Sequence, residues 1–335
     1  MEKFFVAVNV RRRRGKAVAC ATCHLISDLI SLKKLSLDKF SRSQNFCLKN
    51  FYGVIDLRIR VFQTGKVYVS HALPFKDKMK NPNPLQLSLL SLYGRRNRIW
   101  LPVSAYLVEH SDYKILIDTG WHCDISPNGE YNRRAQVKHM GLGHFLLNQR
   151  ILPEGKSIVE QLSEMNIAPA DLDFVIMTHL HTDHASGLKS VTAAKKILVS
   201  AAEVQDTKNY PIRYASSMWN GVDFETFHFK NTGVGPVGKS LDLLGDGSIE
   251  LVNIPGHTSG LTAVKLNSNG KFVLLFSDGG YATKSWQNLI PPGTALDEEL
   301  AFKSLLWIRE MSLQENCLES LANHDADVIP HEINF

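Results

Sequence analysis

Short apolar runs separated by glycine, proline and charged residues recur along the chain from Val61 onward. Runs rich in β-branched residues predict strands over residues 61–70, 103–109, 114–118, 174–177, 196–199, 249–254, 261–266 and 272–276. Between the second and third runs, His110-Ser111-Asp112 has the composition of a tight turn, so we expect a hairpin there. That hairpin ends in Asp118-Thr119-Gly120.

Two other segments show helical spacing of apolar residues. Ile158, Val159, Leu162 and Met165 follow a helical repeat, and residues 297–311 place Leu300, Leu305, Ile308 and Met311 on one face. Strands therefore precede and alternate with helices, which indicates a mixed α+β fold. No internal repeat of about 20–50 residues is visible, which excludes solenoids and propellers.

We expect residues 71–101 to form a loop that crosses the surface, because prolines interrupt any long helix in this stretch. The segment is nevertheless apolar, and its large residues are Leu85, Leu87, Leu89, Leu90, Tyr93 and Trp100. They are compatible with a groove for an acyl chain, with part of the core, or with the surface of a homodimer. The sequence leaves these three interpretations open.

The positive charge of the protein is concentrated at its start. The chain has 335 residues and a formal net charge of +5, but residues 1–50 alone hold 11 Lys/Arg and 3 Asp/Glu. Subtraction leaves 27 Lys/Arg and 30 Asp/Glu in residues 51–335, a net charge of −3. A mildly acidic body gives nucleic acid no electrostatic attraction, so we expect no nucleic-acid partner.

Residues 1–50 differ from the rest and are interpreted as a flexible basic extension, with the fold occupying residues 51–335. No stretch of about 20 apolar residues is present, so we expect no membrane span. The five cysteines are too few for a disulfide framework in a chain of this length. A reducing compartment, the cytoplasm, is therefore the expected location.

Directly after the apolar run at 174–177 comes Thr178-His179-Leu180-His181-Thr182-Asp183-His184. Imidazole nitrogens combined with a carboxylate oxygen suit zinc or a neighbouring first-row metal. A solvated polar turn seldom holds three histidines. A strand that ends in a tight loop, by contrast, can turn such side chains toward one point. We therefore expect the loop to bind metal.

One ion cannot accept all four of these side chains without strain, because Asp183 and His184 point to a different side from His179 and His181. The loop thus implies two metals, each of which needs further ligands. The candidates follow other predicted strands or lie near the end of the chain: His257 in Pro255-Gly256-His257, Asp278 in Ser277-Asp278-Gly279, and His324 in Asn323-His324-Asp325.

The motif His179-x-His181-x-Asp183-His184, followed by His257, Asp278 and His324, resembles the metallo-β-lactamase superfamily. The resemblance covers about residues 54–335 and implies an αβ/βα sandwich with a dinuclear site at one edge of its sheets. It implies that His179, His181 and His257 bind one metal and that Asp183, His184 and His324 bind the other. Asp278 would bridge them. His331 is the alternative to His324, which is preferred because its spacing from Asp278 is similar to the family's.

The bridged ions implied by this resemblance would be two divalent cations, zinc or else iron, manganese or cobalt. Such a pair activates water, so the expected reaction is hydrolysis. Tyr281, three residues after Asp278, is similar to a tyrosine of the N-acyl homoserine lactonases in this superfamily. The resemblance therefore implies a lactonase of the quorum-quenching type, with Asp278, Tyr281 and Asp183 as catalytic candidates and a small lactone or ester as substrate. A packing role for Tyr281 stays open.

Two other functions are compatible with the same residues. A thioesterase or glyoxalase II-like hydrolase would use the same centre, although no basic, phosphate-binding segment is apparent for a large thiol cofactor. A non-catalytic ligand-binding protein on the same scaffold is the second alternative, and the intact set of ligand-type residues argues against it. Asp118 is interpreted either as an acid that orients a metal ligand or as a simple turn residue.

Overall fold

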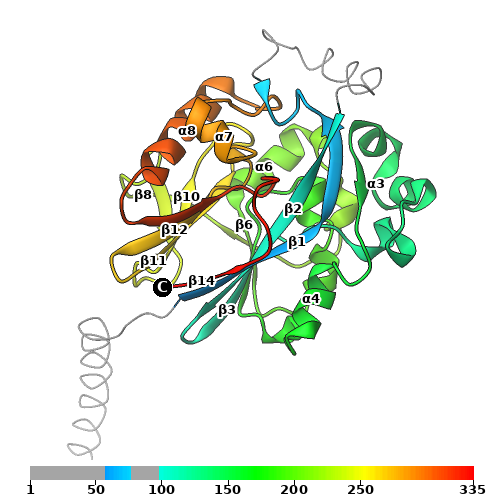
Figure 1. Ribbon diagram of the computed structural model, residues 1–335, viewed down its shortest axis with the longest axis horizontal. Coiled ribbons are helices and arrows are strands. Elements are labelled where there is room, and N and C mark those ends of the chain that lie inside the picture. The colour runs from blue at the N-terminus through cyan, green and yellow to red at the C-terminus, as the bar shows by residue number, and fades with distance from the viewer. Residues whose placement is uncertain (1–56, 77–97) are drawn as a thin grey trace, which may run out of the picture. The chain divides into compact units, whose positions relative to one another are not determined.

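The computed structural model describes residues 57–76 and 98–335, which form two stacked β-sheets with helices on their outer sides (Figure 1). This arrangement is the α+β sandwich that the sequence predicted. The predictions for residues 1–50 and for Leu85, Leu87, Leu89, Leu90 and Tyr93 lie outside the described residues.

The first sheet contains most of the N-terminal half of the fold. Its strands, in spatial order, are β14 (Glu332–Asn334), β1 (Leu57–Ser70), β2 (Arg98–His110), β3 (Tyr113–Ile117), β5 (Phe174–Ile176), β6 (Ile197–Ser200) and β7 (Glu225–Phe227), and β4 (Gln149–Ile151) also pairs with β1. The predicted β2–β3 hairpin is confirmed, since Tyr106 pairs with Ile117 and His110 with Tyr113. From β3 onward the neighbouring strands run parallel.

The second sheet is built from the C-terminal half. Its order is β13 (Cys317–Leu321), β12 (Lys271–Leu275), β11 (Thr262–Ser268), β10 (Ile249–Asn253), β9 (Lys239–Asp242) and β8 (Lys230–Asn231). Strands β12 and β13 are parallel, whereas β10, β11 and β12 form an antiparallel meander. As a result, β10, β12 and β13 all point in the same direction.

Helices cover the outer faces, with α3 and α4 beside the first sheet and α7 and α8 beside the second (Figure 1). Their bounds are α3 (Arg133–Leu147), α4 (Ile158–Glu164), α5 (Thr182–Ala185), α6 (Ala201–Asn209), α7 (Thr283–Asn288) and α8 (Glu298–Ser312). The predicted helices at α4 and α8 are confirmed. Ser157 and Glu160 form a capping box at the start of α4, and the Asp297 side chain accepts from Leu300 N at the start of α8.

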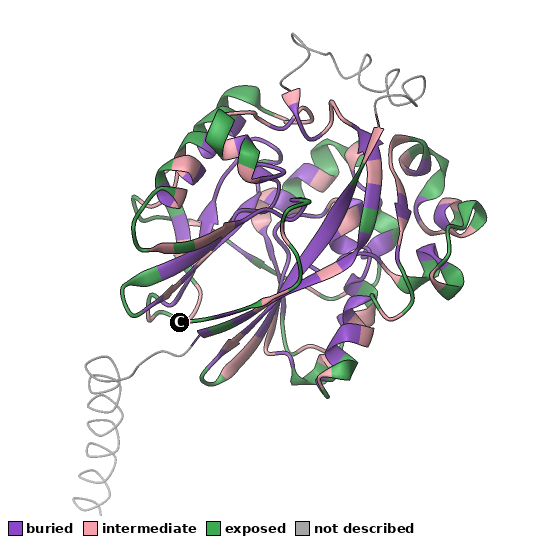
Figure 2. Cartoon of the chain, in the orientation of Figure 1, coloured by how far each residue is buried: buried purple, intermediate pink, exposed green. Residues whose placement is uncertain are grey.

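Three apolar clusters hold the layers together. One lies between the sheets, one between the first sheet and its helices, and one between the second sheet and α8. The strands are accordingly buried along most of their length, while the helices expose one side (Figure 2). Each fully buried leucine or isoleucine contributes about 1.5–3 kcal/mol to the stability of the fold. The sandwich therefore forms a stable frame for the loops at its edge.

Two sequence-based boundaries differ from the structure. Residues 98–101, predicted as part of a loop, belong to β2, where Leu101 is buried and Trp100 stacks on Tyr68 with ring centroids 4.8 Å apart. The helix α3 was not predicted, because its regular spacing is broken at Gly141, whose φ is +84°. The first departure reflects packing between segments that are distant in sequence, and the second reflects a local break.

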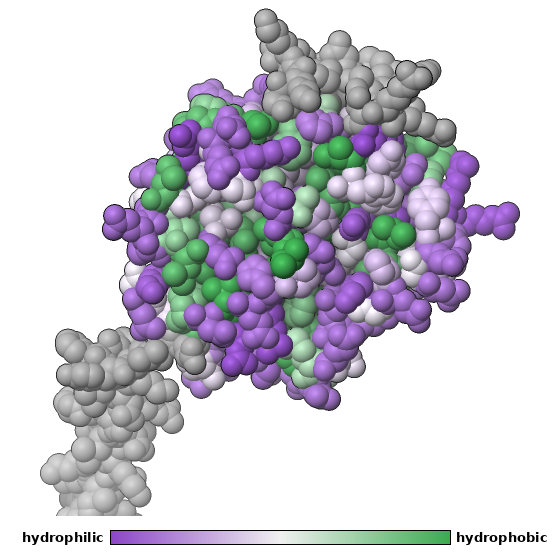
Figure 3. Space-filling view, viewed as in Figure 1, coloured by the Kyte–Doolittle hydropathy of each residue, from purple (hydrophilic) through white to green (hydrophobic). Residues whose placement is uncertain are grey.

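The surface shown in Figure 3 carries hydrophobic residues scattered among hydrophilic ones. Across residues 57–76 and 98–335, no helix is both long and apolar enough to span a membrane.

Candidate metal centre

The candidate ligands all follow the carboxyl ends of strands. The His179–His184 loop follows β5, His257 follows β10, Asp278 follows β12 and His324 follows β13. The two sheets meet there, since Thr262 N donates to Thr178 O across the sandwich at 3.0 Å. Strand direction therefore brings side chains more than a hundred residues apart to one edge.

The turn before His257 depends on a glycine. Gly256 has φ +138°, and a Cβ atom built on it would lie 2.2 Å from Ala301 N in α8. Only glycine fits this close approach. The sharp turn expected from Pro255-Gly256 is present, and it places His257 Nε2 2.9 Å from His181 Nδ1.

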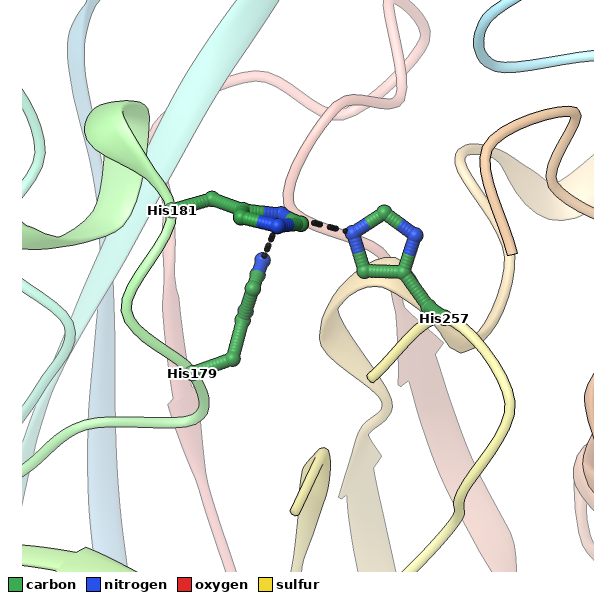
Figure 4. A group of neighbouring side chains, drawn as sticks. All are labelled: His179, His181 and His257. Atoms are coloured by element: carbon green, nitrogen blue, oxygen red, sulfur yellow. Dashed lines mark hydrogen bonds between the residues drawn. The ribbon is translucent and has the colours of Figure 1, made fainter. Parts of the chain in front are cut away.

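Three histidines form the first group of converging side chains (Figure 4). His181 Nδ1 lies 3.1 Å from His179 Nε2 and 2.9 Å from His257 Nε2. His179 and His257 are buried, with 0% and 2% of their surface exposed. The three nitrogens thus face a common point.

The second group contains Asp183, His184 and His324. The helical turn α5 starts at Thr182 and carries Asp183 and His184 away from His181. His324 Nε2 lies 3.4 Å from Asp183 Oδ2, and the rings of His184 and His324 meet edge to face at 5.5 Å. His184 also lies close to His179, with ring centroids 4.0 Å apart, so the two groups adjoin each other.

Asp278 lies between the two groups and directs one oxygen toward each. Its Oδ2 lies 3.4 Å from His257 Nε2 and 3.8 Å from His179 Nε2. Its Oδ1 lies 3.3 Å from both His184 Nε2 and His324 Nε2. This carboxylate is 1% exposed, so its surroundings are these imidazoles rather than solvent.

The donor atoms fit metal ions. His184 Nε2, His324 Nε2 and Asp278 Oδ1 are buried and have no hydrogen-bond partner among the described residues. Buried polar atoms without partners are costly. Zinc–nitrogen bonds of about 2.0–2.1 Å place tetrahedral ligands roughly 3.4 Å apart, close to the separations in both groups. The nitrogen and oxygen set also matches zinc and its neighbours.

The electrostatics of the first group keep its imidazoles neutral. Burial lowers the pKa of His257 to about 3. Burial and neighbouring imidazoles lower the pKa of His179 and His181 well below the usual value. Neutral imidazole is the form that binds a metal.

In the second group, the neighbouring charges outweigh burial in setting the pKa values. Burial opposes protonation of His184, but the carboxylates of Asp118 and Asp278 outweigh it and raise the pKa of His184 well above its usual value. Burial would also raise the pKa of Asp278, yet His324 and His184 hold it well below the ordinary range. A cation bound here takes the place of the proton.

Asp118 orients His184 from behind. Its Oδ2 accepts from His184 Nδ1 at 2.7 Å, and its Oδ1 accepts from Thr178 N at 2.8 Å. Asn323 Nδ2 donates to the same Oδ2 at 3.0 Å. The residue is fully buried with φ +58°, a left-handed conformation that its surroundings must enforce. The geometry thus favours the orienting role over that of a simple turn residue.

We expect Asp118→Asn to weaken metal binding in the second group by about 10–100-fold. In either orientation, the amide NH2 faces a donor that the carboxylate accepts from: Thr178 N on the Oδ1 side, or His184 Nδ1, Thr178 Oγ1 and Asn323 Nδ2 on the Oδ2 side. Titration of the metal-free protein with zinc measures the effect. If both equivalents bind as in the wild type, Asp118 does not orient His184.

The other predicted residues are placed as follows. Tyr281 is 9% exposed and its ring stacks on His324, with centroids 5.1 Å apart and planes 18° apart. His331 lies outside the group, where its Nε2 contacts Glu319 Oε2 at 2.9 Å. The geometry therefore selects His324 over His331 as the partner of Asp183.

Sequence reasoning missed two features of this region. Asn323 precedes His324 and reaches the Asp118 network, but a single asparagine gives no signal in sequence. His122, Asp124 and His139 form another converging group at the surface, and no motif in the sequence links them. The fold, rather than their spacing, brings them together.

A family model described as the metallo-beta-lactamase superfamily matches residues 98–282, more than half of the chain. The chain belongs to the metallo-beta-lactamase superfamily. The matched segment contains every candidate ligand of the two groups except His324, which lies beyond α8. In this superfamily member, the assignment of His324 depends on the geometry described above.

Two named relatives align with about two thirds of this chain. N-acyl homoserine lactonase AttM of Azorhizobium caulinodans is 23% identical over 240 residues, which span 69% of this chain and 84% of the relative. An N-acyl homoserine lactonase from a Bacillus species is 27% identical over 219 residues, which span 64% of this chain and 78% of the relative.

Solved structures agree at the level of the fold. An N-acyl homoserine lactone hydrolase with N-hexanoyl-L-homoserine at its catalytic metal centre superposes with a TM-score of 0.61 and 20% identity, covering 81% of this chain and 94% of that one. AidC, a dizinc quorum-quenching lactonase, gives a TM-score of 0.55 and 14% identity, covering 82% and 90%.

Proposed function

We propose that this protein is a dinuclear metal-dependent hydrolase that opens the ring of N-acyl homoserine lactones. The observation that carries the proposal is the placement of Asp278, whose two oxygens face two separate groups of ligand atoms. The group of His179, His181 and His257 would hold one ion. The group of Asp183, His184 and His324 would hold the other. The similarity to named lactonases supports the choice of substrate.

Two divalent ions, zinc in our proposal, would activate water as a nucleophile and polarise the lactone carbonyl. The chain's own residues set the conditions for that chemistry. Asp278 fixes the two groups relative to each other, and burial of His179 and His184 excludes bulk water from the inner side. Asp183, half-buried, places a carboxylate oxygen 3.4 Å from His324 Nε2.

Asp278 and Tyr281 would supply the proton carrier and a hydrogen-bond donor. A carboxylate oxygen of Asp278 would carry a proton from the attacking water to the ring oxygen that departs. Burial, with the charges of Asp278 and Asp183, raises the pKa of Tyr281 well above its usual value. Its hydroxyl therefore stays protonated and would donate to the lactone carbonyl oxygen. The product would be the ring-opened N-acyl homoserine.

We expect Tyr281→Phe to lower kcat about 100-fold while leaving metal content and Tm unchanged. The variant keeps the ring on His324 and removes only the hydroxyl. Tyr113→Phe, at the opposite end of β3 from Asp118, is the matched control and should retain wild-type kcat. Unchanged kcat in Tyr281→Phe would assign the residue to packing alone.

The substrate class is tested by comparing kcat/KM for acyl homoserine lactones, aryl esters, thioesters and bis-aryl phosphodiesters. The proposal requires the lactones to be turned over fastest. Faster turnover of thioesters would favour the thioesterase alternative, and faster turnover of phosphodiesters would overturn the carbonyl chemistry. A protein that binds metal but turns over none of these substrates would be the ligand-binding alternative.

We further propose that residues 51–335 form the hydrolase domain and that residues 1–50 take no part in the chemistry. Every ligand candidate lies within the compact unit Ile55–Phe335, which supports this division. We place the enzyme in the cytoplasm, because Cys123 and Cys317 in the described part of the chain are free thiols.

A further inference from the structure

Glu203 on α6 is a buried acid that the proposed chemistry does not use. It is 0% exposed, and across the described ranges it forms no ion pair with a lysine, arginine or histidine. A buried carboxylate without a cation is costly unless hydrogen bonds compensate. Its position therefore points to a role beyond packing.

Glu203 contacts the neighbours of all three histidines in the first group. Its Oε1 accepts from Leu180 N, between His179 and His181, at 2.9 Å. The hydroxyls of Thr258, next to His257, and of Tyr214 lie close enough to lower the pKa of this carboxyl group, but its Oε2 has no hydrogen-bond partner among the described residues. The Tyr214 ring lies 5.2 Å from the His181 ring.

The approach of the loop after His257 to α6 is unusually close. A Cβ atom on Gly260 would lie 2.1 Å from Glu203 N and 2.4 Å from Ser200 Oγ. Ser200 Oγ donates to Gly260 O at 2.9 Å, and Asp206 Oδ2 accepts from Ser259 N at 2.6 Å. The start of α6 is thus fastened to the segment that carries His257.

The second group is held by different residues. Asp118 accepts from His184 Nδ1, and the backbone carbonyl of Pro102 contacts His324 Nδ1 at 2.8 Å. None of the hydrogen bonds given for Glu203 within residues 57–76 and 98–335 reaches these groups. Each half of the centre therefore has its own supporting acid.

We propose that Glu203 is a positioning residue that sets the geometry, and hence the metal affinity, of the three-histidine group alone. This inference rests on the metal centre of the proposed function but not on the lactone substrate. It assigns Glu203 to one ion and Asp118 to the other.

The test measures zinc affinity in two variants that each keep one group. His324→Ala keeps the three-histidine group, and His257→Ala keeps the group of Asp183 and His184. Adding Glu203→Ala should weaken zinc binding about 10–100-fold in the His324→Ala protein and by less than about threefold in the His257→Ala protein. Competition with a chromophoric chelator gives both affinities without any assay of lactone turnover.

Glu203→Gln separates positioning from folding, because its amide oxygen can still accept from Leu180 N. We expect zinc affinity within about threefold of the parent. Gln136→Ala, which removes a buried side chain bonded to the Arg150 backbone, should lower Tm without changing either affinity. The inference is overturned if Glu203→Ala lowers the zinc affinity of both groups equally or of neither. It is also overturned if Glu203→Gln lowers zinc affinity as much as Glu203→Ala does.

Discussion

Asp278→Asn is expected to lower kcat/KM by at least about 1000-fold, equivalent to roughly 4 kcal/mol of transition-state stabilisation. The carboxylate serves both groups of ligand atoms, with Oδ2 toward His257 and Oδ1 toward His184. The amide turns one of these oxygens into an N–H donor, whichever way it is oriented. One group must therefore lose a ligand, and the proton carrier is lost as well.

The control for Asp278→Asn is Asp173→Asn. Asp173 is an acid that bonds Lys195 Nζ and Lys114 N rather than the metal centre. Its replacement should leave kcat/KM within about threefold of the wild type, since surface ion pairs contribute little. Near-native turnover of Asp278→Asn in protein that is fully loaded with metal would contradict the assigned role.

Removal of the metals with a chelator should abolish turnover and lower Tm by about 8 °C or more. A ligand present at about 1000 times its Kd stabilises the native state by roughly 4.1 kcal/mol. Proteins of 150–250 residues shift by about 2–4 °C per kcal/mol, and this somewhat larger fold should lie at the low end. Calorimetry and a lactonase assay on the same sample measure both effects.

Zinc added back should restore both turnover and Tm, because the protein frame around the centre stays folded. The same chelator saturated with zinc beforehand is the control and should change neither quantity. A metal-free protein that keeps its full rate would show that the chemistry does not require the two ligand groups.

The convergence of these side chains could be predicted because most of them lie in short, distinctive turns at strand ends. His179 to His184 share one loop, and Pro255-Gly256 mark the turn before His257. His324 was harder, since no such motif surrounds it and the family match ends before it. Its contact with Asp183 appears only once β13 pairs with β12.

Other features could not be predicted because they depend on packing between distant segments. No motif surrounds Glu203 in the sequence, and only the fold buries it where its Oε1 accepts from Leu180 N. Strands such as β8 and β14 contain two or three residues, too few to show an alternating pattern. Helix α3 is also interrupted at Gly141 and buries only Gln136, Met140 and Phe145, which is too few apolar positions to show a helical repeat.

The most direct test of the account is the metal content of the full-length protein purified with zinc and without chelator. We expect about two equivalents per chain in the wild type and about one in His324→Ala, which loses a ligand of the second group only. A wild-type value below about one equivalent would contradict the claim that these two groups of side chains form a dinuclear centre.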